Sequence, residues 1–338
     1  MIRVAAVDCG TNSIRLLVAD LDPASGVLTD VERRMEIVRL GQDVDRTGRL
    51  APHALARTLA VTAEFARVCA DHGVQRIRFV ATSATRDAAN GAEFLAGVRA
   101  LVGVDAEVVS GAEEAALSFV GATRGLRAAP GPAGSARQGP PPGAAASPVL
   151  VVDLGGGSTE VVLGTGGDGR VEASRSVDVG SVRLTERYLA GDPPSQDQVA
   201  AARAEVDRVL DQVAVDVPLD RARQLVGLAG SVTTVTAHAL RLPRYDSTRI
   251  HGCVLPIAEV RAACEDLVTM SRERRAALPY LHPGRVDVIG AGALIWDRVL
   301  DRVAAASGIT EVMTSEHDIL DGIAWSIAES ITESAERP

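Results

Sequence analysis

The chain has 338 residues, of which 46% are hydrophobic and 23% charged, and this length predicts about two domains that each bury a core. All 35 basic residues are arginines. The absence of lysine excludes Walker A loops, protein kinases and pyridoxal phosphate Schiff bases, which all require one. The net charge of −9 argues against a nucleic-acid partner, and a polyanionic ligand would need local arginines or a divalent cation.

Cysteine spacing and hydropathy exclude further classes. The four cysteines form no CxxC pair and have no histidine at metal-ligand spacing, which argues against a zinc site or a disulfide framework. No apolar run reaches the ~18 residues of a membrane span, and the first residues lack the pattern of a secretory signal. We therefore expect a cytoplasmic protein with no membrane partner.

The first part of the chain alternates between strand and helix patterns. Residues 5–20 read as two apolar strands joined by a turn that contains glycine. Residues 52–72 have helical periodicity, with Pro52 in the first turn and Gly73 after the last. We further expect strands at 76–81 and 106–110, and helices at 84–102 and 111–125.

Residues 126–148 do not resemble a folded segment, because they include six prolines and four glycines and offer little to bury. After them, residues 150–165 repeat the pattern of residues 5–20 at a constant offset, so that Asp8 matches Asp153 and Ser13 matches Ser158. Two copies of one hairpin indicate an ancient duplication.

The rest of the chain continues the alternation of strands and helices. Residues 286–305 fit either one long helix or a strand followed by a helix. At the end, Ile319, Ile323, Ile327 and Ile331 recur every four residues, as on one buried face of a helix. We expect strands at 171–179 and 224–229, and helices at 181–189, 195–213 and from Ser231 onward.

This order predicts an α/β protein with two domains. The first domain comprises residues 1–125, with a C-terminal helix at 316–335 packing back on it. A proline- and glycine-rich insert at 126–148 separates it from a second domain at 149–315.

The two hairpin turns are candidate phosphate-binding sites. Glycine and serine in a concave turn expose backbone N–H groups to phosphate oxygens. A carboxylate at the strand end, Asp8 in one copy and Asp153 in the other, can hold Mg²⁺ or its waters. The candidate phosphate-binding residues are Gly10, Thr11, Asn12 and Ser13 in the first turn, and Gly155, Gly156, Gly157, Ser158 and Thr159 in the second.

A third candidate follows the apolar strand near residue 225. There the chain passes through Gly230 into a helix capped by Ser231, and a helix N-terminus after glycine is suited to bind an anion. Beside the two hairpins it would form the third wall of a phosphate cleft.

Five blocks in this order resemble the exopolyphosphatase and guanosine pentaphosphate phosphatase family of the actin-like ATPase superfamily. They are DCGTNS at 8–13, ATSATR at 81–86, SGAEEA at 110–115, DLGGGSTE at 153–160 and GLAGSVTT at 227–234. The resemblance covers nearly the whole chain apart from the insert. It implies two actin-like (ribonuclease H-like) domains with a cleft between them, and Mg²⁺- or Mn²⁺-dependent release of terminal orthophosphate.

The resemblance also implies roles for two charged residues, and a third, Glu160, is a candidate because it shares a strand face with Ser158. Glu114 matches the general base that activates water, while Glu113 is explained by a capping box with Ser110. Arg86 matches a clamp for the terminal phosphate, and Glu160 is a candidate metal ligand beside Asp8 and Asp153.

Several alternatives stay open. The substrate is inorganic polyphosphate, with short chains favoured, or guanosine pentaphosphate. A carbohydrate kinase lacks support because no sugar-binding segment is evident, whereas a non-catalytic actin-like nucleotide-binding protein remains the competing class. The family suggests a homodimer.

Two features bear on how long a bound chain would be. Where relatives often carry a Gly-Leu-Arg-Glu-Gly run near the C-terminus, this chain has Leu320 in place of the arginine, followed by Asp321 and Gly322. Arg272, Arg274 and Arg275 would form either a landing patch for a polyanion or a solvated helix face.

Overall fold

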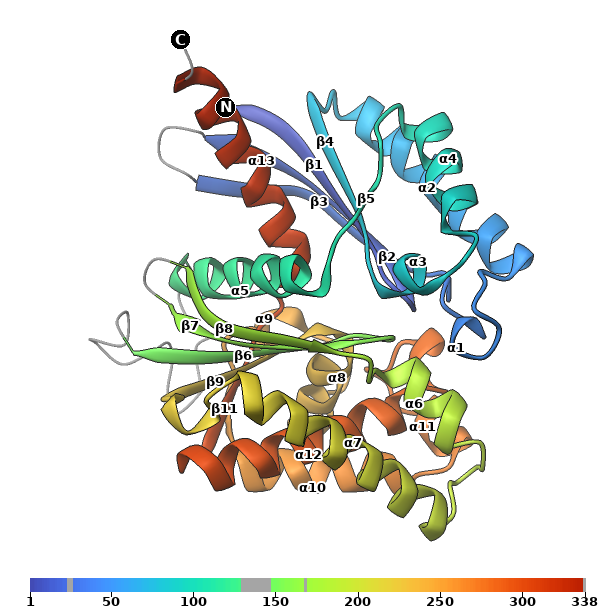
Figure 1. The fold of residues 1–338 in the computed structure, drawn as a ribbon, viewed down its shortest axis with the longest axis vertical. Coiled ribbons are helices and arrows are strands. Elements are labelled where there is room, and N and C mark those ends of the chain that lie inside the picture. Colours follow the sequence, from blue (N-terminus) through green and yellow to red (C-terminus); the bar gives the residue numbers. More distant parts are fainter. Residues whose placement is uncertain (23–26, 129–146, 167–168, 337–338) are drawn as a thin grey trace. The chain divides into compact units, whose positions relative to one another are not determined.

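The computed structural model describes residues 1–22, 27–128, 147–166 and 169–336, and most of the predicted insert therefore lies outside the described residues. The chain divides into two compact units (Figure 1). The first comprises Met1–Gly121 with Ile319–Pro338, and the second Ala122–Asp318. No helix in the described ranges is long and apolar enough to cross a membrane.

The first unit is built on a five-stranded sheet in the order β3-β2-β1-β4-β5. β2 pairs antiparallel with both β1 and β3, while β4 pairs parallel with both β1 and β5. The strands are β1 (Ile2–Cys9), β2 (Ser13–Asp22), β3 (Val27–Ile37), β4 (Arg76–Ala81) and β5 (Glu107–Val108). The helices are α1 (Val44–Thr47), α2 (Pro52–Asp71), α3 (Ser83–Asp87), α4 (Gly91–Val102), α5 (Gly111–Ala128) and α13 (Ile319–Glu336).

Helices cover both faces of this sheet. On one face α2 and α4 pack over an aromatic core in which the Phe79 and Phe94 rings meet edge to face, with 6.1 Å between centroids. On the other face Leu117 of α5 joins Ile319, Ile323 and Ile327 of α13 in a second core. The predicted four-residue isoleucine repeat is therefore buried as far as the structure describes side chains, which excludes Ile331.

The second unit has a six-stranded sheet in the order β10-β11-β9-β6-β7-β8. Its core lies largely between this sheet and α7, α10 and α12, around the fully buried Trp296. Its strands are β6 (Pro148–Leu154), β7 (Thr159–Thr165), β8 (Arg170–Val177), β9 (Gln224–Leu228), β10 (Val254–Pro256) and β11 (Glu311–Thr314). Its helices are α6 (Ser181–Tyr188), α7 (Gln196–Asp216), α8 (Ala229–Ala239), α9 (Ser247–Ile250), α10 (Ile257–Thr269), α11 (Arg272–Ala276) and α12 (Ile289–Ser307), with 3₁₀ turns η2 (Leu219–Arg221) and η3 (Pro283–Arg285).

The two sheets repeat one topology, which confirms the α/β class and the duplicated hairpin. In both, an antiparallel three-strand meander continues into two parallel strands, β3-β2-β1-β4-β5 in one and β8-β7-β6-β9-β11 in the other. Asp8 pairs across its hairpin with Arg15, and Asp153 pairs with Glu160 at the matching position.

Some expected elements differ from those observed. The helix expected at 84–102 is two helices, because the Asn90 side chain bonds the backbone N–H and carbonyl of Leu50 at 2.8 and 3.2 Å and breaks the run. Residues 286–305, left open by periodicity, lie mostly in the single helix α12. The strand expected at 106–110 is only Glu107–Val108, and the exposed edge strand β3 was not predicted.

The three arginines of the 272–275 segment do not share one face. Arg275 is only 6% exposed, and its guanidinium packs against Gly290 in the first turn of α12. Arg272 pairs with Asp287 at 2.5 Å. The three arginines therefore form neither the predicted landing patch nor the predicted solvated face, because Arg275 is buried against α12.

Candidate functional site

The loop that follows β3 forms hydrogen bonds with the backbone carbonyls of the first hairpin turn. The carbonyl of Thr11 accepts from the Gly41 N–H at 2.9 Å, and that of Asn12 from the Val38 and Arg39 N–H groups at 3.0 and 2.8 Å. In a trans peptide the next N–H points opposite to the carbonyl. The N–H groups of Asn12 and Ser13 therefore point away from this loop, as a phosphate-binding turn requires.

The second hairpin turn is held in the same way, by α6. The carbonyls of Gly155 and Gly156 accept from the Ser181 and Val182 N–H groups at 3.0 and 2.9 Å. The carbonyl of Gly157 accepts from the Arg183 Nε at 2.9 Å. Three successive carbonyls are thus occupied, and the N–H groups of the same three peptides, those of Gly156, Gly157 and Ser158, face the opposite side.

The contact between α6 and this turn depends on Gly180. A Cβ at Gly180 would lie 2.5 Å from the carbonyl carbon and oxygen of Gly156, which are backbone atoms that cannot move aside easily. Sequence reasoning missed this brace, although a glycine at the start of the helix is a signal for close backbone approach.

We expect Gly180→Ala to displace the second turn and to lower kcat/KM for phosphate release by about tenfold or more, since positioning errors near 1 Å are costly. Steady-state kinetics measure this. Gly166→Ala serves as the control, because among the described residues its methyl group would meet only the Val149 side chain, at 3.3 Å. Equal kinetics for the two variants would show that the brace does not position the site.

The third candidate segment, at Gly230 and Ser231, begins helix α8, whose first turn lies against the first turns of two other helices. A Cβ at Gly292 in α12 would lie 2.4 Å from the Ser231 Oγ of α8 and 3.5 Å from the Ser181 Cβ of α6. The first turns of α6, α8 and α12 therefore meet. Their N–H groups and dipoles favour an anion at this place in the second unit.

Arg285 is a candidate phosphate ligand that sequence reasoning did not single out. Its guanidinium lies against Gly230, where a Cβ would be 2.3 Å from its Cζ. The preceding residue, Ala229, has a φ of +68°, so the turn holds a left-handed residue beside this arginine. Arg285 lies far along the chain from the glycine that accommodates it, which is why no local pattern indicated it.

The side chain of Tyr245 also contacts the first turn of α8. The Tyr245 hydroxyl donates to Glu316 Oε1, 2.6 Å away, and lies 2.9 Å from the Thr233 Oγ1. Burial and the nearby Glu316 raise the pKa of Tyr245 above its usual range, so the phenol stays protonated. It acts here as a neutral hydrogen-bond donor.

The carboxylates at the two strand ends differ in their surroundings. Asp8, 4% exposed, accepts from Arg15 at 2.6 Å, so its charge is already compensated within the hairpin. Asp153 and Glu160, 7% and 2% exposed, stand directly opposite each other on adjacent strands, and Ser176 donates to Glu160 Oε1 at 2.7 Å. Directly opposed carboxylates repel, and a divalent cation relieves that repulsion.

The donor set fits Mg²⁺ only with help from other ligands. Among the described residues no group of three or more His, Cys, Asp or Glu side chains could hold a metal ion. Mg²⁺ usually takes one or two carboxylates and completes its shell with water and phosphate oxygens. The buried Asn12 Oδ1 in the first turn has no hydrogen-bond partner in the described structure and is an acceptor for such a water.

The two candidate glutamates of α5 have different partners. Glu114 is 8% exposed, and its Oε2 accepts from Arg86 Nη1 at 3.2 Å, while the same Nη1 donates to the Val109 carbonyl at 2.8 Å. Glu113 accepts from Arg78 at 2.7 Å, and its N–H donates to the Ser110 Oγ at 3.2 Å. The serine half of the expected capping box is present, and the Glu113 carboxylate is a surface ion-pair partner of Arg78.

In the first unit the predicted residues lie together. The Thr11 hydroxyl hydrogen-bonds the Ser83 hydroxyl at 2.9 Å, and Ser83 begins the short helix α3 that carries Arg86. Arg86 in turn reaches Glu114. The turn, the arginine and the glutamate are thus linked by direct contacts, while the remaining predicted residues form the corresponding set in the second unit.

A cysteine nucleophile is excluded at this place. Cys9 lies between Asp8 and Gly10 and is completely buried. Burial raises the pKa of its thiol well above the usual range, and an inert buried thiol is no nucleophile.

Comparison with known proteins identifies the class to which this fold and site belong. The model of the Ppx/GppA phosphatase family matches residues 17–133 and 143–326. The chain belongs to the Ppx/GppA phosphatase family, as the five sequence blocks predicted.

Individual relatives match over most of their length. The chain is 48% identical to Exopolyphosphatase 2 of Mycobacterium tuberculosis over 333 residues, which is 96% of this chain and 98% of that protein. Exopolyphosphatase 1 of the same species is 29% identical over 300 residues, 87% of this chain and 80% of that protein.

Solved structures agree. The crystal structure of an exopolyphosphatase-like protein superimposes with a TM-score of 0.89 at 42% identity, covering 98% of this chain and 99% of that one. The Ppx/GppA family member of Aquifex aeolicus gives a TM-score of 0.76 at 29% identity, covering 98% of both chains. The α/β class predicted from the sequence is confirmed, and the chain shares its fold over nearly its whole length with these two proteins.

Proposed function

We propose that this protein is an exopolyphosphatase that hydrolyses the terminal phosphoanhydride bond of inorganic polyphosphate and releases orthophosphate. The observation that carries the proposal lies within the first unit, where a turn with outward-facing N–H groups is linked by direct contacts to Arg86 and the buried Glu114. The relative named Exopolyphosphatase 2, at 48% identity, supports the same substrate.

Phosphoryl transfer to water requires positioning and neutralisation of charge more than covalent chemistry. In our proposal the turn N–H groups and Arg86 bind terminal phosphate oxygens, and Glu114 accepts the proton of the attacking water. In the second unit Asp153 and Glu160 would hold Mg²⁺ or Mn²⁺, which would supply charge neutralisation of the phosphates when bound, and Asp8 is the matching candidate ligand of the first unit.

The cellular setting is part of the same proposal. We place the protein in the cytoplasm, as a homodimer without a nucleic-acid or membrane partner, and expect short polyphosphate chains to be preferred. Guanosine pentaphosphate is the second candidate substrate, because backbone N–H groups recognise phosphate without reading the rest of the molecule.

The test is orthophosphate release by the purified protein from short polyphosphate, long polyphosphate, guanosine pentaphosphate and ATP. Release from short polyphosphate at the highest kcat/KM supports the proposal. A preference for guanosine pentaphosphate would assign the second substrate. Nucleotide-dependent assembly without release from any of the four would favour the non-catalytic class.

We expect phosphate release to stop in EDTA and to return when Mg²⁺ is added. Asp153→Asn removes half of the buried carboxylate pair, so it should raise the Mg²⁺ concentration needed for half-maximal activity by about tenfold or more, as loss of a charged ligand does. Titration of activity with Mg²⁺ measures this. Asp178→Asn, a change at an exposed carboxylate of the same unit, is the control, and activity that persists in EDTA would contradict the metal dependence.

A further inference from the structure

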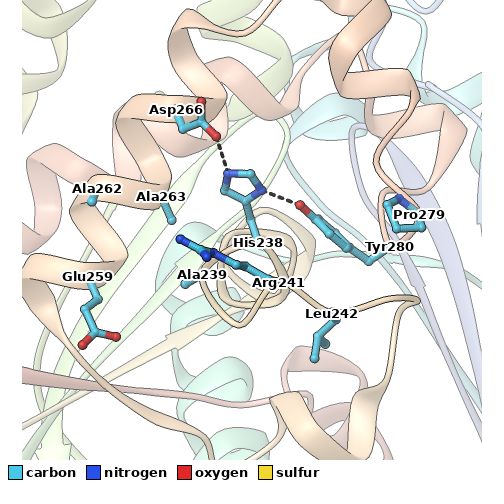
Figure 2. A pocket seen from close by; sticks show the side chains of 10 residues that line it. All are labelled: His238, Ala239, Arg241, Leu242, Glu259, Ala262, Ala263, Asp266, Pro279 and Tyr280. Atoms are coloured by element: carbon cyan, nitrogen blue, oxygen red, sulfur yellow. Dashed lines mark hydrogen bonds and ion pairs between the residues drawn. The ribbon is translucent and has the colours of Figure 1, made fainter.

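A cavity in the second unit lies away from the phosphate-binding turns. It has a volume of about 610 Å³, within the range of small-molecule sites, and opens between the end of α8, one side of α10 and the segment before η3 (Figure 2). Gly230 and Ser231 lie in the first turn of α8, whereas His238 lies in its last turn. The 11-residue helix spans ~16 Å, so the cavity is at the opposite end of that helix.

A rigid polar network forms one wall of this cavity. The Tyr280 hydroxyl bonds His238 Nδ1, and His238 Nε2 donates to Asp266 Oδ2 at 2.9 Å (Figure 2). Tyr280 is 6% exposed and packs with Leu242 in a small apolar cluster. Burial raises the pKa of Tyr280 to about 12, so its hydroxyl remains a donor and the imidazole accepts at Nδ1.

Two opposite charges at the cavity are not paired with each other. Arg241 and Glu259 both line it, and neither side chain has a hydrogen-bond or ion-pair partner in the described part of the chain. Figure 2 shows the Arg241 side chain extending toward the side of α10 that carries Ala263 and Glu259, without a bond to the Glu259 carboxylate. Arg241 has a φ of +50° in the tight turn that ends α8, so the turn fixes where its side chain starts.

Much of the remaining lining of the cavity is apolar. Leu242, Ala262, Ala263 and Pro279 offer small hydrocarbon groups, and Asp266 adds a second, half-exposed carboxylate two turns along α10 from Glu259. Two carboxylates disfavour a polyanion, and Arg241 disfavours a simple cation. A molecule that carries a carboxylate, an ammonium group and an apolar body complements Arg241, a carboxylate and the apolar lining.

We propose that this cavity binds a free α-amino acid with an apolar side chain. Its carboxylate pairs with the Arg241 guanidinium, its ammonium group with Glu259, and its side chain rests on Leu242 and Ala263. The site is independent of the phosphate chemistry, so the proposal does not depend on the substrate of the enzyme.

Calorimetric titration of the full chain with L-leucine, L-methionine and L-phenylalanine tests the proposal. At least one of them should bind with a saturable heat, whereas 4-methylpentanoate and isoamylamine, which each lack one charged group of leucine, should bind about tenfold more weakly or not at all. Absence of binding by all three amino acids would overturn the proposal, as would equal binding of either single-charge analogue.

Substitutions assign the binding to this cavity. Arg241→Gln and Glu259→Gln should each weaken binding by about tenfold or more, because each removes a charge-assisted contact. Both side chains are exposed, so the fold should persist, and near-identical thermal melting of the variants checks this. Arg244→Gln and Glu273→Gln, exposed neighbours that do not line the cavity, are the matched controls, and equal loss in the controls would contradict the assignment.

Discussion

Replacing Glu114 with glutamine is expected to lower the turnover number by about 100-fold or more, the range typical for loss of a general base. Glutamine keeps the size of the side chain and can still accept the hydrogen bond from Arg86, but it cannot take a proton from water. The fold and the KM should therefore change little. Steady-state orthophosphate release and thermal melting of the variant measure both quantities.

Glu113→Gln is the matched control, because it makes the same chemical change one residue away. The Glu113 carboxylate is 45% exposed and pairs with Arg78 at the surface, where an ion pair contributes at most about 1 kcal/mol. Its activity should stay near that of the wild type. Wild-type turnover in Glu114→Gln, or equal losses in both variants, would reject Glu114 as the base.

Gly322→Ala is expected to destabilise the first unit, although alanine is normally the better helix former by ~1 kcal/mol. The added Cβ would lie 2.0 Å from the Leu117 carbonyl oxygen of α5, so the two helices must separate. Overpacking of this kind costs about 1–3 kcal/mol. Leu117 lies one turn after Glu114 on α5, and activity should fall as well.

Denaturant unfolding and orthophosphate release measure these two effects. Gly97→Ala is the control, because its methyl group would also enter a helix crossing, yet would meet the flexible end of the Leu59 side chain at 2.7 Å. Its loss of stability should be clearly smaller. A Gly322→Ala protein as stable as the wild type would show that α5 and α13 do not pack as closely as described.

The sequence predicted the two hairpin turns because they are encoded locally. Each turn is a short block with glycine and serine that follows an apolar strand ending in aspartate. The repetition of this block distinguished the two turns from an ordinary Asp-Gly turn. Strand β4 was predicted to its ends, and α2 to within one residue, because Pro52 and Gly73 mark its limits. Gly73 indeed has a left-handed φ of +63°.

The sequence did not predict the contacts that join distant segments. Gly180 and α6 orient the second turn, and Arg285 lies against Gly230, but neither pairing has a local signature. The break before α4 has the same origin, since Asn90 is drawn to Leu50 by hydrogen bonds across the unit. Propensity and spacing describe neighbours in the chain, whereas these features depend on tertiary packing.

The structure explains why the segment at 320–322 differs from the motif that relatives often carry near the C-terminus. Leu320, in place of an arginine, is 1% exposed and packs in the core between α13 and the sheet. Asp321, 2% exposed, pairs with Arg33 of β3 at 2.6 Å. The segment therefore anchors α13 to the first unit, and the missing arginine is replaced by an apolar contact.

Resolving the products of polyphosphate of defined length on a gel, at early times and with Mg²⁺, tests the central claim most directly. The account predicts that orthophosphate appears first, that the remaining chains shorten from their ends, and that neither occurs with Glu114→Gln. Fragments of intermediate length without orthophosphate, or intact chains after incubation with the wild-type protein, would contradict it.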